Sequence, residues 1–147
     1  MEIAILALGC FWGPEIKFGK LEGVTKTEVG YCGGNSDTTT YEKVCSGNTN
    51  HAEVVRLEFD PKKISYEKIL QYFFEIHNPT TLNAQGPDIG TQYRSEIFYL
   101  NDSQRVVAER VLRDVDDRMS GKVVTKISLL KNYCPAEEYH QKYLEKR

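Results

Sequence analysis

The cysteine with the most reactive surroundings is Cys10, which follows an apolar run of strand length and precedes a helix that starts near Pro14. Unpaired N–H groups and the dipole at a helix N-terminus stabilise a thiolate, and this lowers the pKa of the thiol by about one unit. Phe11 and Trp12 follow directly, and such rings form an apolar pocket suited to a thioether or a sulfoxide methyl group. The alternative is a small cysteine buried beside core aromatics.

Glu53 is the second candidate, because it lies in a largely apolar stretch that has the pattern of a strand. Alternation places it on the same face as Val55 and Leu57, an unusual position for a carboxylate. If Glu53 is buried, its pKa rises and it can act as a general acid at neutral pH. The other interpretation is a solvated glutamate at the end of a strand.

Three further polar residues, Tyr41, Asp88 and Tyr93, lie on or beside irregular segments, where binding groups are often found. The chain has nine tyrosines, so each of them taken alone is weak evidence and packing is the other explanation.

The histidines leave two other classes of function open. A Cys–His hydrolase would need His51, His77 or His140 next to Cys10, but no local signature marks the partner and a structural role is favoured for each. A non-catalytic module that binds methionine-rich segments through its aromatic residues is the third hypothesis. The Cys and His residues lack metal-ligand spacing, so we predict no metal site.

The elements that must position these groups follow from hydrophobic periodicity and turn residues. Strands are expected at residues 3–8, 24–31, 51–60, 94–100 and 123–130. Helices are expected from Pro14 to before Gly23, from a Ser65 cap to Ile76, from an Asp102 or Ser103 cap to Gly121, and over 135–145. Residues 79–94 form a long irregular loop, which is usually functional. This order predicts an α+β fold around a split βαβ core, in one domain.

Composition bounds the function classes. With 147 residues, 40% hydrophobic and 27% charged, the chain has the composition of one globular domain. A net charge of −2 gives no basic field for nucleic acid or anionic lipid. The N-terminus lacks the pattern of a secretory signal, no apolar run is long enough to cross a membrane, and four cysteines are too few for a disulfide scaffold. We therefore expect a cytoplasmic protein with free thiols.

Several motifs in order along the chain resemble one known family, that of peptide methionine sulfoxide reductase A. The motifs are Gly9-Cys10-Phe11-Trp12-Gly13, Tyr41 with Val44-Cys45-Ser46-Gly47, His51-Ala52-Glu53-Val54-Val55, Asn78-Pro79-Thr80-Thr81, Gln85 through Ser95, and Pro135 through Gln141. They span nearly the whole chain, so the signal is much stronger than that of any single motif.

The resemblance implies an oxidoreductase (EC 1.8.4.11) that reduces methionine S-sulfoxide, free or in proteins, for protein repair and antioxidant defence. The implied fold is a two-layer α/β roll around a split βαβ (ferredoxin-like) core, with a mixed, mostly antiparallel sheet, in a single catalytic domain over residues 1–147. No bound cofactor is implied, only an external thiol reductant such as thioredoxin or glutaredoxin. We expect a monomer.

The resemblance also implies a role for each site residue. Cys10 attacks the sulfoxide sulfur and Glu53 protonates the oxygen. The side chains that bind the substrate are Phe11, Trp12, Tyr41, Asp88 and Tyr93. Cys10 is left as a sulfenic acid, which a second thiol reduces through a disulfide.

The sequence departs from the family pattern mainly at the residues that concern recycling. Cys32 and Cys134 occupy positions where other residues are more usual, and Cys45 belongs to a motif whose cysteine is not usually given the resolving role. We expect Cys134, or else Cys32, to resolve the sulfenic acid, with direct attack by an external thiol as the alternative. Asn50 replaces a common glycine before the His-Ala-Glu triplet, which puts the local turn in question.

Overall fold

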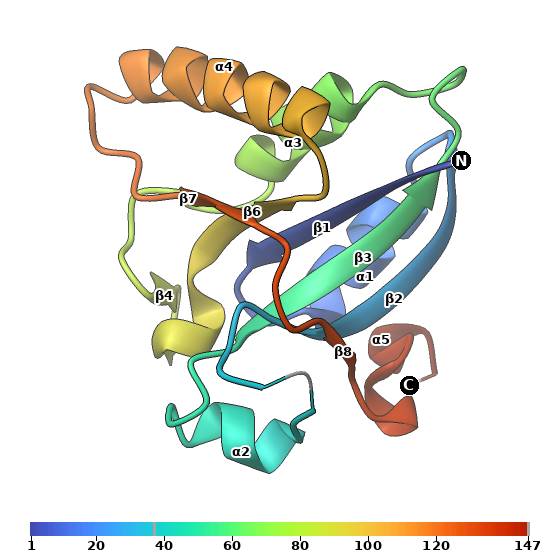
Figure 1. Ribbon diagram of the computed structural model, residues 1–147, viewed down its shortest axis with the longest axis vertical. Helices are drawn as coiled ribbons and strands as arrows, with labels where there is room; N and C mark the ends of the chain where they lie inside the picture. Colours follow the sequence, from blue (N-terminus) through green and yellow to red (C-terminus); the bar gives the residue numbers. More distant parts are fainter. Residues whose placement is uncertain (37, 147) are drawn as a thin grey trace.

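A six-stranded sheet forms the centre of the computed structural model, which describes residues 1–36 and 38–146 (Figure 1). The strand order is β7-β6-β1-β3-β2-β8. The strands are β1 (Glu2–Leu8), β2 (Val24–Cys32), β3 (Ala52–Phe59), β6 (Ser95–Tyr99), β7 (Lys126–Leu129) and β8 (Cys134–Pro135). Only the β6–β7 pairing is parallel among these strands. The predicted α+β class with a mostly antiparallel sheet is confirmed.

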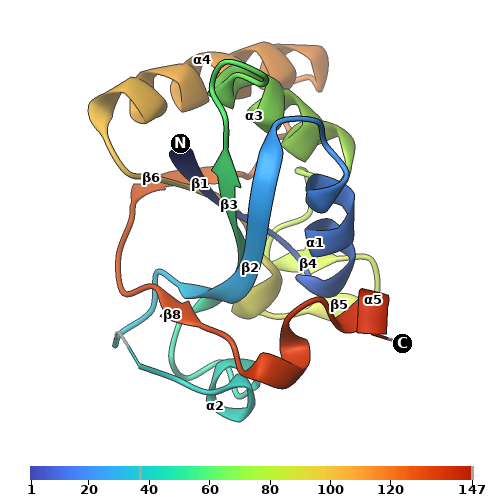
Figure 2. The same ribbon diagram turned by 90° about the vertical axis from the view of Figure 1, so that its right-hand side faces the viewer.

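Three longer helices bury side chains in one large core cluster against the sheet. They are α1 (Trp12–Gly19), α3 (Tyr66–Glu75) and α4 (Asp102–Arg118). Figure 2 shows α1 and α3 on the same side of the sheet. Shorter elements complete the chain: α2 (Tyr41–Cys45), β4 (Ala84–Gln85), β5 (Asp88–Ile89), η1 (Thr91–Tyr93), η2 (Glu138–His140) and α5 (Tyr143–Lys146).

The alternation along β3 decides which face of the sheet carries Glu53. Val55 and Leu57 enter the large cluster, whereas Ala52 and Val54 enter a smaller cluster on the opposite face. Because side chains on a strand alternate, Glu53 lies on the same face as Val55, beneath the helices. The predicted strand therefore places a carboxyl group inside the apolar layer.

Two helix N-termini test the predicted caps. The Ser65 side chain accepts a hydrogen bond from the Lys68 N–H, which confirms the cap of α3. The cap of α4 is Asn101, whose side chain accepts from the Gln104 N–H, so the prediction of Asp102 or Ser103 is wrong by one or two residues. Asn is as good a cap as Asp or Ser, and periodicity alone does not choose among neighbours.

The last predicted helix, 135–145, is wrong. Pro135 belongs to the edge strand β8 instead, paired with Gly30. The Gln141 side chain then takes the place of a neighbouring strand, because its Oε1 accepts from the Val29 N–H and its Nε2 donates to the Val29 carbonyl, both at 2.9 Å. These long-range bonds compete with helix formation, and only α5 remains helical.

Two smaller differences concern segments near the end of the molecule where α2, β8 and α5 lie (Figures 1 and 2). The predicted loop 79–94 contains the β4–β5 hairpin and the turn η1. The short helix α2 is capped by Thr40, whose side chain accepts from the Lys43 N–H, and it was not predicted. Helices of this length have no detectable period in the sequence.

Candidate active site

Cys10 lies where β1 ends and α1 begins, as predicted. Gly9 makes the turn with φ of 99°, and a Cβ at this position would come within 2.9 Å of the Gln85 side chain. Both facts require glycine there. Phe11 is the cap residue of α1, so the half-buried thiol of Cys10 stands immediately before the first turn of that helix.

The protonation of Cys10 differs from the prediction. Burial raises the pKa of the Cys10 thiol to about 11, the Trp12 N–H lowers it, and the charges of Glu53 and Asp88 raise it further. The predicted lowering of this pKa is wrong for the free site, because one backbone donor does not outweigh desolvation and two nearby carboxylates.

Glu53 is 1% exposed, so the alternative of a solvated strand-end glutamate is wrong. Its Oε1 accepts a hydrogen bond from the Phe11 N–H at 3.3 Å, and its Oε2 is buried without a hydrogen-bond partner. Burial raises the pKa of Glu53 to about 8, against the Phe11 N–H, which lowers it, while Asp88 raises it. The carboxyl group is therefore protonated at neutral pH, and it lies next to Phe11, the residue that follows Cys10.

The raised pKa of Glu53 predicts a stability cost that depends on pH. Below its unfolded pKa the group is protonated in both states, and the cost grows as pH rises from about 4.5 until it levels off above about 8. At roughly 1.4 kcal/mol per pKa unit, the full cost is on the order of 5 kcal/mol. We expect the free energy of unfolding of the wild type, relative to Glu53→Gln, to fall between about pH 5 and about pH 9.

Urea unfolding at both pH values measures this difference. Glu22→Gln, which removes an exposed carboxyl group in the turn after α1, is the matched control and should follow the wild type at both pH values. If the free energies of unfolding of the wild type and Glu53→Gln change in parallel with pH, Glu53 does not have the raised pKa of a buried, protonated carboxyl group.

Tyr41, Tyr93 and Asp88 come from three different segments and meet at the same place. Burial raises the pKa of Tyr93 to about 12, and the charges of Glu53, Cys45, Asp88 and Cys10 raise it further. The pKa of Tyr41 is also raised, first by burial and then by Cys45, Glu53 and Tyr93. Both hydroxyl groups therefore stay protonated and can donate hydrogen bonds to an oxygen bound between them.

Glu137 fixes the start of α2, and with it the backbone of Tyr41. Its Oε2 accepts from the Tyr41 N–H at 3.0 Å, and its Oε1 accepts from the Tyr31 hydroxyl at 2.7 Å. Glu137 belongs to the closing motif of the chain, so this motif and the tyrosine of the site are joined across 96 residues.

Sequence reasoning gave no role to Arg94, which fixes the turn that carries Tyr93. Its guanidinium donates to the Thr91 carbonyl at 2.9 Å and to the Asn50 carbonyl at 3.1 Å, and it pairs with Glu96 at 2.7 Å. Asn50 has φ of 61°, a conformation that Asn tolerates better than most residues, so the departure from glycine keeps the turn before β3. The signal in the sequence was a charged residue in a loop that borders an apolar strand.

Aromatic side chains form one wall of the site. Phe11 is buried and Trp12 is half-buried. The Trp12 ring stacks on Tyr143 at 3.8 Å between centroids, with 14° between planes, and its N–H donates to His140 Nδ1 at 3.1 Å.

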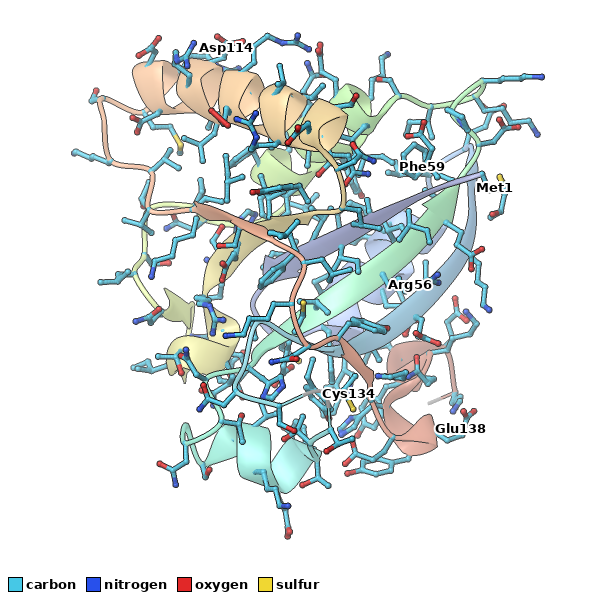
Figure 3. All side chains as sticks on the ribbon, in the orientation of Figure 1. Met1, Arg56, Phe59, Asp114, Cys134 and Glu138 are labelled. Atoms are coloured by element: carbon cyan, nitrogen blue, oxygen red, sulfur yellow. The ribbon has the colours of Figure 1, made fainter. Side chains whose placement is uncertain are left out.

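The other cysteines differ in position. Cys32 is buried in the smaller cluster, on the face of the sheet opposite Glu53. Cys134 and Glu53 both pair with Tyr31, so they share a face, but two strand spacings, about 10 Å, separate them. Cys134 lies on β8 near the segment that leads into α2, with Sγ 3.8 Å from the Thr39 carbonyl oxygen (Figure 3). Cys45 lies beside the site, where its charge adds to the rise in the pKa of Cys10 and of Tyr93.

Two of the three histidines, His77 and His51, are engaged away from Cys10. His77 contacts the Phe73 carbonyl and the Ser95 hydroxyl, and His51 contacts the Ser36 carbonyl. Over residues 1–36 and 38–146, no group of three or more His, Cys, Asp or Glu side chains is arranged to hold a metal ion. In the same part of the chain, no helix is long and apolar enough to cross a membrane.

The half-buried thiol, the buried carboxyl group and the two tyrosine hydroxyls are groups suited to thiol chemistry. The sequence profile of the family "Peptide methionine sulfoxide reductase" matches residues 2–147. The chain belongs to this family, whose activity is that of an oxidoreductase, EC 1.8.4.11. The "Peptide methionine sulfoxide reductase MsrA" of Pelagibacter ubique (strain HTCC1062) is 76% identical over 147 residues, which is all of both chains.

Solved structures agree with this assignment. The crystal structure of reduced Mxr1 from Saccharomyces cerevisiae has a TM-score of 0.94 and 38% identity, and the match covers 99% of this chain and 85% of that one. Mxr1 in complex with Trx2 has a TM-score of 0.69 and 25% identity, over 97% of this chain and 84% of that one.

Proposed function

We propose that this protein reduces the S-epimer of methionine sulfoxide, free and in proteins, through the Cys10 thiol. The Cys10 sulfur attacks the sulfoxide sulfur, the sulfur–oxygen bond of the substrate breaks, and the oxygen passes to Cys10. A thiol and a sulfoxide thus become a sulfenic acid and a thioether, so Cys10 is oxidised by two electrons and the substrate is reduced by two. The biological role is protein repair under oxidative stress.

The observation that carries this proposal is the link between the two reacting groups. The Phe11 N–H, one residue after Cys10, donates to the Glu53 carboxyl group, which is buried with a pKa of about 8. A departing oxygen needs a proton, and a buried acid next to the nucleophile supplies it. Asp88 helps to order the site through its charge.

The remaining side chains bind the sulfoxide. Tyr41 and Tyr93 keep their protons and donate hydrogen bonds to the sulfoxide oxygen. Phe11 and Trp12 hold the methyl group, since sulfur and its substituents pack well against aromatic rings. Methionine formation from S-sulfoxide but not R-sulfoxide, with thioredoxin or dithiothreitol as reductant, tests the proposal, and wild-type protein that yields no methionine from either epimer would refute it.

A pH profile tests the pairing of Cys10 and Glu53. Attack needs a thiolate and the oxygen needs a proton, so the active pair holds one proton between its two groups. With pKa values of about 8 and about 11, the pair holds two protons below about pH 8 and one above it. We expect kcat/KM to rise roughly tenfold per pH unit up to about pH 8 and then to level off.

Single-turnover rates without added thiol measure this profile, because the ionisation of an external reductant then does not enter. In Glu53→Gln the break near pH 8 should disappear, and the rate should continue to rise with the thiolate fraction of Cys10. If the break near pH 8 persists in Glu53→Gln, the titrating group is not Glu53.

A second thiol completes the cycle: it attacks the Cys10 sulfenic acid, a disulfide forms and water leaves. Cys134 is our candidate because it shares a face with Glu53, while Cys32 would have to reach around the sheet. The alternative is direct attack by an external thiol. A thioredoxin-type protein as final reductant is supported by the neighbour Mxr1, which was solved in complex with Trx2. Intact mass after one turnover separates these routes: a loss of about 2 Da means an internal disulfide, and retention of one oxygen means none.

We also propose that residues 1–147 act as one catalytic domain and as a monomer without a bound cofactor. The order β6-β1-β3-β2, with β1 and β2 on either side of β3, supports the interpretation of a split βαβ core. A cytoplasmic location is supported by the four cysteines, which are all free thiols.

A further inference from the structure

His140 is a buried histidine that the proposed reaction does not use. It is 1% exposed and lies in η2, within the closing motif of the chain. Four aromatic rings surround it: those of Tyr139 at 4.2 Å, Tyr41 at 4.4 Å, Phe11 at 5.3 Å and Trp12 at 5.7 Å between centroids. Three of these four rings belong to residues of the candidate site, so His140 stands at the centre of its aromatic wall.

A specific hydrogen bond joins His140 to Trp12. The indole N–H of Trp12 donates to His140 Nδ1 at 3.1 Å. Nδ1 can accept only when it carries no proton, so the ring is neutral with its proton on Nε2. Burial also lowers the pKa of His140, although Glu137 raises it, and this favours the neutral ring.

The hydrogen bond and the stacking on Tyr143 restrict the indole in different directions. Stacking at 3.8 Å and 14° fixes the plane of the Trp12 ring, but it leaves the ring free to turn within that plane. The bond from Nε1 to His140 fixes the direction in which the ring points. Together they fix the orientation of the indole.

Packing alone does not explain a histidine at this position. A phenylalanine would fill similar space in the aromatic cluster without burying two ring nitrogens. The Nε2 atom is buried without a hydrogen-bond partner, which carries an energetic cost, and Nδ1 is the ring nitrogen that bonds to another side chain, that of Trp12.

We propose that His140 is a positioning residue for the substrate: it orients Trp12, and through Trp12 it sets the shape of the pocket for the methyl group of the sulfoxide. The inference rests on the proposed function and deepens it. It makes the closing motif part of substrate recognition, although His140 itself touches no reacting atom.

Two variants of His140 separate the hydrogen bond from the bulk of the ring. His140→Asn keeps an acceptor near the position of Nδ1, and His140→Phe keeps the ring and loses the acceptor. In single-turnover kinetics, we expect His140→Phe to raise the concentration of free methionine S-sulfoxide needed for half-saturation about tenfold, which is the size of one lost hydrogen bond. The rate at saturation should change by less than about threefold. His140→Asn should restore most of the affinity.

Trp12 is the only tryptophan of the chain, so its fluorescence reports directly on the same contact. In His140→Phe the emission should shift to the red and acrylamide should quench it more, whereas His140→Asn should resemble the wild type. Wild-type affinity and emission in His140→Phe would overturn the proposal. Equal loss in both variants would also overturn it, because an acceptor at this position would then not restore the affinity.

A replacement at Trp12 keeps the test valid if His140→Phe does not fold. β-(Benzothien-3-yl)alanine has the shape of tryptophan and a sulfur atom in place of the N–H group, and incorporation at the one tryptophan position removes the donor alone. We expect the same tenfold loss of affinity, and unchanged affinity would refute the role of the bond. Failure of the proposed function looks different, because the wild type would then form no methionine.

Discussion

Replacing Cys10 by serine is expected to reduce methionine formation from the S-sulfoxide to below about one-thousandth of the wild-type rate. A serine hydroxyl ionises far less readily than a thiol and is a poor nucleophile toward sulfur. The substitution changes one atom, so the turn at Gly9, the cap of α1 and the bond from the Phe11 N–H to Glu53 should persist. The loss would then be chemical rather than structural.

Cys32→Ala is the matched control for this experiment. Cys32 lies on the opposite face of the sheet, so the first turnover, measured without added thiol, should proceed at the wild-type rate. Near wild-type methionine formation by Cys10→Ser would show that another residue attacks the substrate. If neither the wild type nor Cys10→Ser formed methionine, the result would favour the hypothesis of a non-catalytic binding module.

Glu53→Gln is expected to slow the first turnover by roughly 10²–10⁴-fold at neutral pH, the usual contribution of a placed general acid. Glutamine keeps an oxygen that can accept from the Phe11 N–H at the position of Oε1, and it keeps the size of the side chain. It has no acidic proton to give to the oxygen. The effect should appear in the rate at saturating sulfoxide, with little change in the concentration needed for half-saturation.

Glu53→Asp separates proton donation from geometry. Aspartate retains an acid but shortens the side chain by one methylene, so its rate should lie between those of the wild type and Glu53→Gln. A Glu53→Gln variant as fast as the wild type would remove Glu53 from the chemistry and leave the two tyrosine hydroxyls as the groups that stabilise the oxygen.

The fold follows from the sequence wherever local patterns and long-range packing agree. The alternation of β3 and the cap at Ser65 are local signals, and both elements appear as predicted. The closing segment is different, because it is held by contacts across the chain: the Gln141 side chain bonds to Val29, which lies 112 residues away. No pattern within 135–145 records that partner, so helical composition gave the wrong answer.

The site shows the same division. The residue types and neighbours of Cys10 and Glu53 make them candidates but leave structural alternatives open, and the burial of Glu53 agrees with its place in an apolar strand. The pKa of Cys10 depends on how the surrounding loops desolvate it and on Asp88 and Glu53, which lie far apart in the sequence. The direction of its shift therefore required the tertiary structure, as did the roles of Arg94 and His140.

The most direct test of the account is a single-turnover experiment on the fully reduced wild-type protein with excess methionine S-sulfoxide and no reductant. We predict about one equivalent of methionine or slightly more per protein, with Cys10 as the oxidised residue in peptide mapping, and no methionine from the R-epimer. Absence of methionine from the S-epimer, or its formation with Cys10 still a free thiol, would contradict the attack of Cys10 on the sulfoxide.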